Sequence, residues 1–139
     1  MTNDAPMQLE PPRPVPTPTS RPFWDGLAED RVCLQQCSAC DHWVFYPRSR
    51  CSACLADALV WREVSGAATL YTWTVCHRAP SPHFAAWTPF VLAVVELSEG
   101  VRMTTTLVDA DMDQLRAGLA LKPVFDRTEG VTRLCYAPA

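Results

Sequence analysis

Four cysteines are the residues of this chain whose types and spacing point most directly to chemistry. Cys37 and Cys40 form one Cys-x-x-Cys pair, and Cys51 and Cys54 form a second pair after ten intervening residues. Each pair fits a tight turn that directs two sulfurs at one ion, and the spacing is typical of a zinc ribbon. Because four thiolates complete a tetrahedral shell, the pattern predicts a closed structural zinc site that stabilises the fold and does no chemistry on substrate.

Other chemistries of the same cysteines stay open at this point. A four-sulfur site also suits a rubredoxin-type iron, although zinc is the preferred ion. A redox-active pair needs a strand-to-helix setting, whereas the strand formers of residues 43–46 follow the first pair. Two disulfides would need an oxidising compartment.

A short hairpin must bring the two cysteine pairs together. Residues 32–36 are predicted to lead as a strand into the first pair, and residues 43–46 form the outgoing strand, which Pro47 ends. Arg48 and Arg50 precede the second pair. A cation there would be stabilised by a doubly negative metal–thiolate cluster, or it would reach an acidic ligand or partner.

A short helix is predicted ahead of the ribbon. Ser20 and Pro22 favour its start, and it would run to about residue 30. Phe23 and Trp24 are aromatic residues on so short a helix that they must pack against something. That surface is either the ribbon and barrel or a partner protein.

The chain after the second cysteine pair is patterned for β structure. Strands are predicted at residues 59–64, 69–76, 89–97, 101–108, 121–125 and 131–136. A short helix capped by Asp109 or Asp111 would precede the last pair of strands. The order fits a small Greek-key barrel. The predicted fold class is therefore mainly β, with an N-terminal helix and a rubredoxin-like zinc ribbon followed by a five-stranded OB-fold barrel.

Length and composition limit the class of protein. The chain has 139 residues, a net charge of −3 and 48% hydrophobic residues. The acidic balance argues against a nucleic-acid binder, and no apolar run approaches the roughly 20 residues that span a membrane. No signal peptide is visible, so seven cysteines favour metal ligation in a reducing cytoplasm.

The chain divides into three predicted segments. Residues 1–20 are rich in proline and form an extended tail, either disordered or laid over a partner. Residues 21–58 hold the helix and the zinc ribbon. Residues 59–139 hold the OB-fold barrel.

A self-contained active site is not expected. The candidates are His77, His83, Asp109, Asp111 and the cysteines outside the ribbon. A catalytic Cys–His pair needs facing side chains, but Cys76 and His77 are neighbours on a strand and point to opposite faces. The sequence holds no nucleophile elbow, phosphate loop or His-Glu-x-x-His motif.

The predicted loop at residues 77–88 is a candidate binding surface. Arg78, Phe84 and Trp87 combine a cation with exposed apolar bulk, as protein interfaces do. An ordinary loop that caps the barrel is the alternative.

Several motifs carry a resemblance to a known family. They are Phe23-Trp-Asp-Gly-Leu27, Leu34-Gln-Gln-Cys37 with Cys40, Phe45-x-Pro47-Arg48 before the second pair, Ser65–Thr74, Pro89–Leu97, and Gly118 ahead of Val124. Residues 21–137 thereby resemble the acyl-CoA-associated zinc-ribbon and OB-fold proteins once called domain of unknown function thirty-five. The zinc-ribbon motif is specific, and the barrel motifs are less so.

The resemblance implies a non-catalytic subunit of a hetero-oligomer, with two copies of each chain as one arrangement. Its partner would be a thiolase-superfamily enzyme, such as a lipid-transfer-protein-like aldolase that cleaves a carbon–carbon bond in steroid side-chain degradation. Acyl-CoA would lie at or near the interface. Phe23, Trp24, His77, Arg78, Phe84 and Trp87 are the residues expected to face the partner or CoA.

Two alternative functions remain. The chain could be a subunit of a thiolase or acyltransferase complex, because the choice of a lyase rests on the resemblance alone. It could also be an OB protein that stacks single-stranded nucleic acid on Tyr71 and Trp73. Lys122 is the one lysine of the chain, so the salt-dependent part of such binding would be small.

Overall fold

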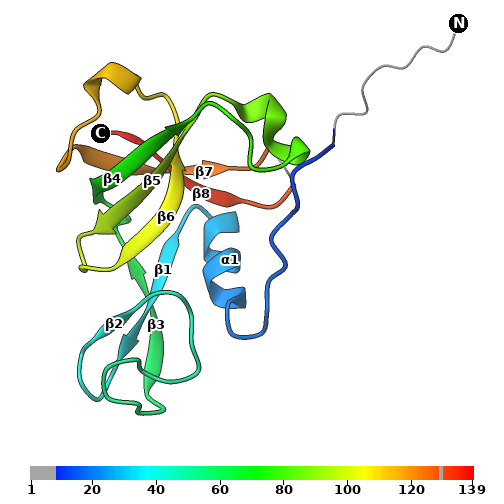
Figure 1. The fold of residues 1–139 in the computed structure, drawn as a ribbon. Helices are drawn as coiled ribbons and strands as arrows, with labels where there is room; N and C mark the ends of the chain where they lie inside the picture. Colours follow the sequence, from blue (N-terminus) through cyan, green and yellow to red (C-terminus); the bar gives the residue numbers. More distant parts are fainter. Residues whose placement is uncertain (1–8, 129) are drawn as a thin grey trace, which may run out of the picture.

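The computed structural model of this chain describes residues 9–128 and 130–139. Residues 9–17 form no helix or strand, and the first eight residues of the predicted tail lie outside the described part. Helix α1 (Arg21–Ala28) follows, and the chain then builds a three-stranded sheet and a separate closed barrel (Figure 1). This confirms the predicted fold class, which joins a helix and a ribbon to a five-stranded barrel.

Helix α1 forms where the sequence predicts it and ends slightly earlier. Pro22 occupies its first turn, where the missing N–H costs no hydrogen bond. The N–H of Arg31 donates to the carbonyl of Gly26 at 2.8 Å, and Asp30 adopts a φ of 59°. This left-handed residue ends the helix after Ala28.

The ribbon sheet has three strands, β1 (Val32–Cys37), β2 (Trp43–Val44) and β3 (Leu59–Val64), in the order β2-β1-β3. Strand β3 pairs antiparallel with β1 along its whole length, from Val32 opposite Val64 to Cys37 opposite Leu59. From the sequence, this segment is predicted to be the first strand of the barrel. In the structure it belongs to the ribbon sheet, because its register matches the strand that leads into the first cysteine pair.

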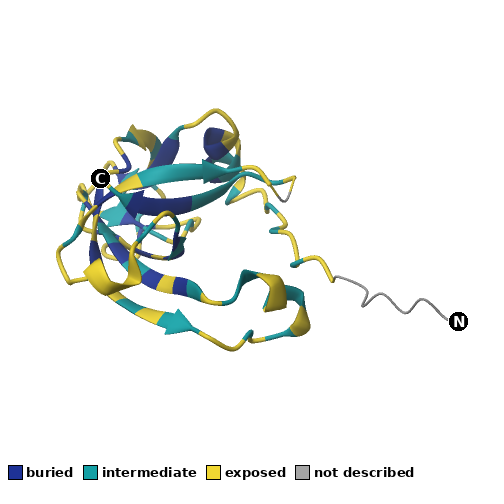
Figure 2. Ribbon diagram, turned by 90° about the horizontal axis from the view of Figure 1, so that it is seen from above, coloured by how far each residue is buried: buried dark blue, intermediate teal, exposed yellow. Residues whose placement is uncertain are grey.

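The barrel closes in the order β4-β5-β6-β8-β7. Its strands are β4 (Ala68–Cys76), β5 (Phe90–Leu97), β6 (Arg102–Leu107), β7 (Ala120–Asp126) and β8 (Arg133–Pro138). Leu70, Val95, Leu97 and Tyr136 are among the fully buried side chains of its interior. Figure 2 shows buried residues along the strands, whereas the N-terminal segment is mostly exposed.

Strands β6 and β8 close the barrel with very little backbone pairing. The parallel strands β6 and β8 form a single residue pair, Leu107 with Tyr136. Beyond it, side chains connect the strands: the Thr105 hydroxyl donates to the Leu134 carbonyl at 2.8 Å, and Thr106 Oγ1 lies 3.5 Å from Cys135 Sγ. We call this junction the seam.

The short helix that was predicted to begin at Asp109 or Asp111 is a single 3₁₀ turn, η2 (Met112–Gln114). Asp111 caps it by accepting a hydrogen bond from the N–H two residues later, at 2.9 Å. The chain then leaves the helical path because its backbone pairs with β4. The N–H of Gly118 donates to the carbonyl of Leu70 at 2.8 Å, and the N–H of Leu70 donates to the carbonyl of Leu119 at 2.9 Å.

A second 3₁₀ helix lies in the predicted loop between β4 and β5. This segment, η1 (Pro82–Trp87), contains no buried residue. Among the helices of the described residues, none is long and apolar enough to cross a bilayer.

Candidate metal centre and apolar face

The four ribbon cysteines converge on one point. All four Sγ atoms lie within 4.8 Å of one another, with 3.6 Å between Cys37 and Cys54 and 3.7 Å between Cys40 and Cys51. A disulfide would hold two sulfurs about 2.05 Å apart, so these thiols are free. Tetrahedral zinc with Zn–S bonds of about 2.3 Å separates its sulfurs by about 3.8 Å. The donor set therefore fits a closed four-sulfur metal site.

Two turns of the same design present these sulfurs. In each turn the N–H of the first cysteine donates to the carbonyl five residues later, and the N–H four residues later donates back to that cysteine. The fifth residue of each turn adopts a φ of 62°. The residues involved are Cys37, Asp41 and His42 in the first turn and Cys51, Leu55 and Ala56 in the second.

The backbone of the second turn favours a thiolate. Hydrogen bonds from the backbone N–H groups of Cys54 and Ala53 lower the pKa of Cys51 to about 6. The backbone of His42 acts in the same direction on Cys40, but burial and the three neighbouring thiols raise the pKa of Cys40 to about 12. Four sulfurs this close cannot all become thiolates on their own, because the negative charges repel one another. A divalent ion that replaces their protons neutralises this charge.

A buried glutamine fixes the loop that leads into the second turn. The Gln35 side chain accepts a hydrogen bond from the N–H of Arg48 at 2.8 Å and donates to its carbonyl at 2.9 Å. The predicted cations Arg48 and Arg50 are both exposed, and Arg50 Nη1 lies 3.4 Å from the carbonyl of Leu55. This role of Gln35 was not predicted, because a polar residue in a strand gives no sign of a backbone contact thirteen residues away.

An apolar groove of about 570 Å³ lies along the seam. The N-terminal segment, α1, the residues after β2 and strands β5, β6 and β8 form its walls. Its lining includes Pro14, Val15, Phe23, Trp24, Tyr46, Leu92, Met103, Thr104, Thr106, Arg133 and Leu134.

A second hollow of about 310 Å³ adjoins the groove beneath η1. Leu92 and Thr106 line both, so the two hollows lie next to each other. Cys76, Arg78, Pro80, Phe84, Trp87 and Phe90 complete the second hollow. We call the two hollows together the apolar face.

The apolar face contains five of the six residues that are predicted from the sequence to face a partner or CoA. Phe23 and Trp24 line the groove, and Arg78, Phe84 and Trp87 line the second hollow. His77 is exposed and lines neither. The structure places these side chains on one surface; their contact with a partner or with CoA stays a prediction.

Phe23 and Trp24 contribute to the groove in different ways. Phe23 is only 7% exposed and packs on Phe45, with 5.7 Å between ring centroids. Trp24 is half-buried and stands edge-on to Phe23 at 5.3 Å. Phe23 therefore anchors the helix to the core, and Trp24 offers the more accessible surface.

An aromatic stack supports the second hollow. Trp87 lies edge-on to Phe84 at 5.1 Å and to Phe90 at 6.4 Å. The guanidinium carbon of Arg133 lies 4.5 Å from the centroid of the Trp87 ring. This cation–π contact connects η1 to strand β8.

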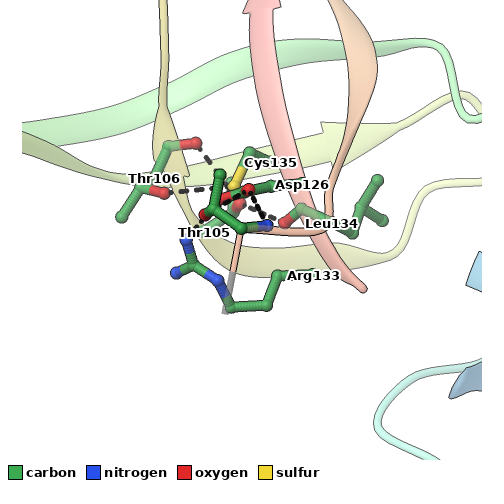
Figure 3. Close-up of polar contacts among 7 residues, drawn as sticks. Thr105, Thr106, Asp126, Arg133, Leu134 and Cys135 are labelled. Carbon is green, nitrogen blue, oxygen red and sulfur yellow. Dashed lines mark hydrogen bonds and ion pairs between the residues drawn. The ribbon is translucent and has the colours of Figure 1, made fainter. Parts of the chain in front are cut away.

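Arg133 was not singled out from the sequence. It stands opposite Asp126 in the β7–β8 hairpin and forms an ion pair with it. Figure 3 draws this pair beside Thr105, Thr106 and Leu134 of the seam. Opposite charges flanking a predicted hairpin turn are the sequence signal that could have found the pair.

The histidine and aspartate candidates for chemistry lie in three segments: just after β4, in η1 and next to η2. His77 is exposed at the end of β4, and His83 Nδ1 lies 3.4 Å from the Ser81 hydroxyl. Asp109 and Asp111 are exposed next to η2. Within residues 9–128 and 130–139, the ribbon cysteines are the one cluster of three or more potential metal ligands.

Comparisons with known proteins agree with this architecture. Residues 24–60 match the family model described as the ChsH2 rubredoxin-like zinc ribbon domain. Residues 61–126 match the model described as the ChsH2 C-terminal OB-fold domain.

Two curated relatives match over most of this chain. The chain is 33% identical over 107 residues to a DUF35 domain-containing scaffold protein of Methanocaldococcus jannaschii, covering 75% of this chain and 74% of that protein. It is 30% identical over 118 residues to a probable enoyl-CoA hydratase alpha subunit of Thermomonospora curvata. That match covers 85% of this chain but only 36% of the relative.

Two solved structures share the fold. An Ltp2-ChsH2(DUF35) aldolase chain superposes with a TM-score of 0.79 at 27% identity, covering 91% of this chain and 98% of that one. A DUF35-family protein of unknown function from Sulfolobus solfataricus gives a TM-score of 0.64 at 15% identity over 88% of this chain and 86% of that one, which shows the fold alone.

A four-cysteine ribbon joined to a closed five-stranded barrel defines the class of zinc-ribbon and OB-fold proteins. Within that class, the chain belongs to the ChsH2/DUF35 family.

Proposed function

We propose that this chain is a non-catalytic scaffold subunit that docks through its apolar face onto a thiolase-like enzyme acting on acyl-CoA esters. The observation that carries the proposal is the placement of Trp24, Phe84, Trp87 and Arg78 in two adjoining hollows on one side of the barrel. Aromatic residues and arginine are the types that protein interfaces enrich. The similarity to a chain of the Ltp2-ChsH2(DUF35) aldolase supports a partner of this kind.

The proposal assigns the metal centre a structural role. A closed four-sulfur zinc site leaves no coordination position for substrate, so it would hold the ribbon in shape against the barrel. The free cysteines of the chain are consistent with a reducing compartment, which we take to be the cytoplasm. All steps on the thioester would then belong to the partner.

The partner's reaction in this proposal is retro-aldol cleavage of a carbon–carbon bond in the side chain of a steroid CoA ester. The support is the aldolase named for the similar structure. A thiolase or acyltransferase partner is the alternative, and the products distinguish them. An aldolase releases an aldehyde or ketone, whereas a thiolase consumes free CoA.

Co-expression with a thiolase-like protein tests the proposal. The two chains should co-elute, the complex should turn over a CoA ester, and this chain alone should not. The double variant Phe84→Ala/Trp87→Ala should weaken the complex about 30-fold or more, as loss of an interface hot spot does. Tyr71→Ala is the matched control, because Tyr71 is an aromatic residue with 48% exposure that lines neither hollow. If the double variant binds the partner as tightly as the wild type does, the apolar face is excluded as the docking surface.

A further inference from the structure

A polar hollow of about 480 Å³ lies beside the second cysteine turn of the ribbon. Two arginines and three hydroxyl-bearing residues line it, together with Pro47, Cys51 and Leu55; they are Arg48, Arg50, Thr19, Ser49 and Ser52. None of these lining residues is acidic. Pro47 also lines the apolar groove, so this hollow adjoins the apolar face. We call it the arginine hollow.

The two arginines of this hollow have no acidic partner in the described part of the chain. Within residues 9–128 and 130–139, neither Arg48 nor Arg50 forms an ion pair, although five other arginines do. Both side chains are exposed. The whole chain has a net charge of −3, so two uncompensated cations give this hollow the opposite sign of charge. Such a hollow attracts an anionic group.

The backbone around the arginine hollow is held in place. Gln35 is only 5% exposed, and its side chain bonds to both the N–H and the carbonyl of Arg48, at 2.8 and 2.9 Å. The Arg50 guanidinium lies 3.4 Å from the carbonyl of Leu55, which ties it to the second cysteine turn. Both cations are therefore presented without reorganisation of the loop, which lowers the entropic cost of binding.

Leu55 adds an apolar surface that the fold itself does not explain. It is 71% exposed and adopts a φ of 62°, a conformation that bulky residues rarely adopt. The first cysteine turn has the same hydrogen bonds and places Asp41 at the matching position, where aspartate is tolerated more readily. Neither packing nor the turn requires a leucine here. An exposed leucine beside two unpaired arginines is the combination that protein interfaces cover.

We propose that the arginine hollow receives an acidic segment of the thiolase-like partner, whose carboxylates pair with Arg48 and Arg50 and whose apolar part covers Leu55. The inference rests on the proposed function, because it takes that partner as the occupant. Guanidinium groups bind carboxylates and phosphates alike. A protein segment fits better than a free phosphate, because a phosphate would leave Leu55 exposed. The shared wall at Pro47 also places the hollow at the border of the apolar groove, where an interface has its polar rim.

Arg48→Gln/Arg50→Gln tests the charge of the hollow. We expect the affinity of the purified complex, measured by calorimetry in about 50 mM NaCl, to fall about tenfold, because two exposed ion pairs are lost. Raising the salt to about 500 mM should weaken the wild-type complex more than the variant complex.

Arg62→Gln/Arg116→Gln is the matched control, because it removes the same charge from two other exposed arginines. Neither forms an ion pair within residues 9–128 and 130–139, and neither lines the groove, the second hollow or the arginine hollow. The control should bind the partner as the wild type does.

Leu55→Asn tests the apolar part, and it decides the inference if the arginine variant fails to fold. Asparagine adopts a positive φ readily, so the turn should keep its shape and its metal. We expect the complex to weaken about fivefold or more, because the partner loses an apolar contact. Val60→Thr is the control, because Val60 is a 43% exposed residue of the same ribbon that lines none of these hollows.

The remaining outcomes each decide the inference. Unchanged affinity in the arginine variant, or an equal loss in its control, overturns it. Loss of zinc from Arg48→Gln/Arg50→Gln also overturns it, because the arginines would then serve the metal centre. Binding of coenzyme A to the isolated chain that this variant abolishes overturns it as well, because a phosphate would then be the occupant.

Failure of the proposed function gives a different result. If the wild-type chain binds no thiolase-like protein, the function itself is removed. If Phe84→Ala/Trp87→Ala weakens the complex but Arg48→Gln/Arg50→Gln does not, the apolar face remains the docking surface and only the arginine hollow is excluded from it.

Discussion

The hydroxyl of Tyr136 donates a hydrogen bond to the carbonyl of Gly66 at 2.8 Å, across seventy positions of sequence. Tyr136 is fully buried in the barrel, and Gly66 lies in the short connection between the ribbon sheet and the first barrel strand. Burial raises the pKa of Tyr136 well above its usual range, so the hydroxyl stays protonated as a donor. This contact fixes the point where the ribbon enters the barrel.

Tyr136→Phe removes the hydroxyl and leaves the Gly66 carbonyl without that donor. We expect the free energy of unfolding to fall by about 1–3 kcal/mol, the usual cost of an unsatisfied buried polar group. Denaturant titration of the purified chain measures it. Tyr71→Phe is the control, because the Tyr71 ring is exposed and should change stability little. If both variants lose the same free energy of unfolding, the hydrogen bond from Tyr136 to Gly66 does not stabilise the fold more than an exposed hydroxyl does.

Metal removal should unfold the ribbon. We expect one zinc ion per chain by elemental analysis, and about none in Cys54→Ser, because three thiolates and a hydroxyl hold the ion poorly. Cys54 is exposed, so its substitution removes little packing and isolates the coordination effect. Cys76→Ser is the control, because Cys76 lies outside the cluster. Full metal content in Cys54→Ser, or an unchanged fold after chelation, would contradict the structural role.

Much of the fold could be predicted because its signals are local. The cysteine spacing fixes the ribbon turns, and alternating apolar residues mark the barrel strands. Strand pairing is not local. The segment Leu59–Val64 reads as a strand in any sheet, and only its register with β1 places it in the ribbon. The short helix predicted to begin at Asp109 or Asp111 shrinks to one 3₁₀ turn for a similar reason, since β4 supplies the backbone partners for Gly118 and Leu119.

The part of the site that could be predicted is likewise the part whose sequence signals are local. The metal ligands could be predicted from the spacing of Cys37, Cys40, Cys51 and Cys54. Aromatic residues in a predicted loop indicate a binding surface. For Arg133, the opposite charges on either side of a predicted hairpin turn could have indicated its pairing with Asp126. Its contact with Trp87 could not be predicted in this way, because it depends on the fold of η1.

The Asp126–Arg133 pair should make stability depend on pH. Burial acts against the charged carboxyl, but the N–H and hydroxyl of Thr128 and the Arg133 guanidinium outweigh it and hold the pKa of Asp126 below its ordinary value of 3.8. A carboxyl with a lowered folded-state pKa stabilises the fold above its unfolded-state pKa. That stabilisation disappears as the pH falls through the folded-state value.

Asp126→Asn removes this contribution. We expect the variant to be less stable than wild type at neutral pH, and the difference to shrink as the pH falls below about 4. Thermal unfolding of both chains across that range checks it. A constant difference at every pH would mean that the asparagine disturbs packing instead of charge.

Gly66 itself should tolerate no side chain. Its φ is +77°, and an added Cβ would lie 3.0 Å from side-chain carbons of both Pro123 and Val32. Gly66→Ala therefore combines backbone strain with a clash between the ribbon and the barrel, and we expect a loss of at least about 2 kcal/mol. Gly100→Ala separates the two effects. Gly100 has a φ of +88° and no atom within 4 Å of the added Cβ, so it suffers the strain alone, about 1–2 kcal/mol. Denaturant titration of both variants measures the difference, and equal losses would show that the close approach of Pro123 and Val32 to Gly66 costs nothing to relieve.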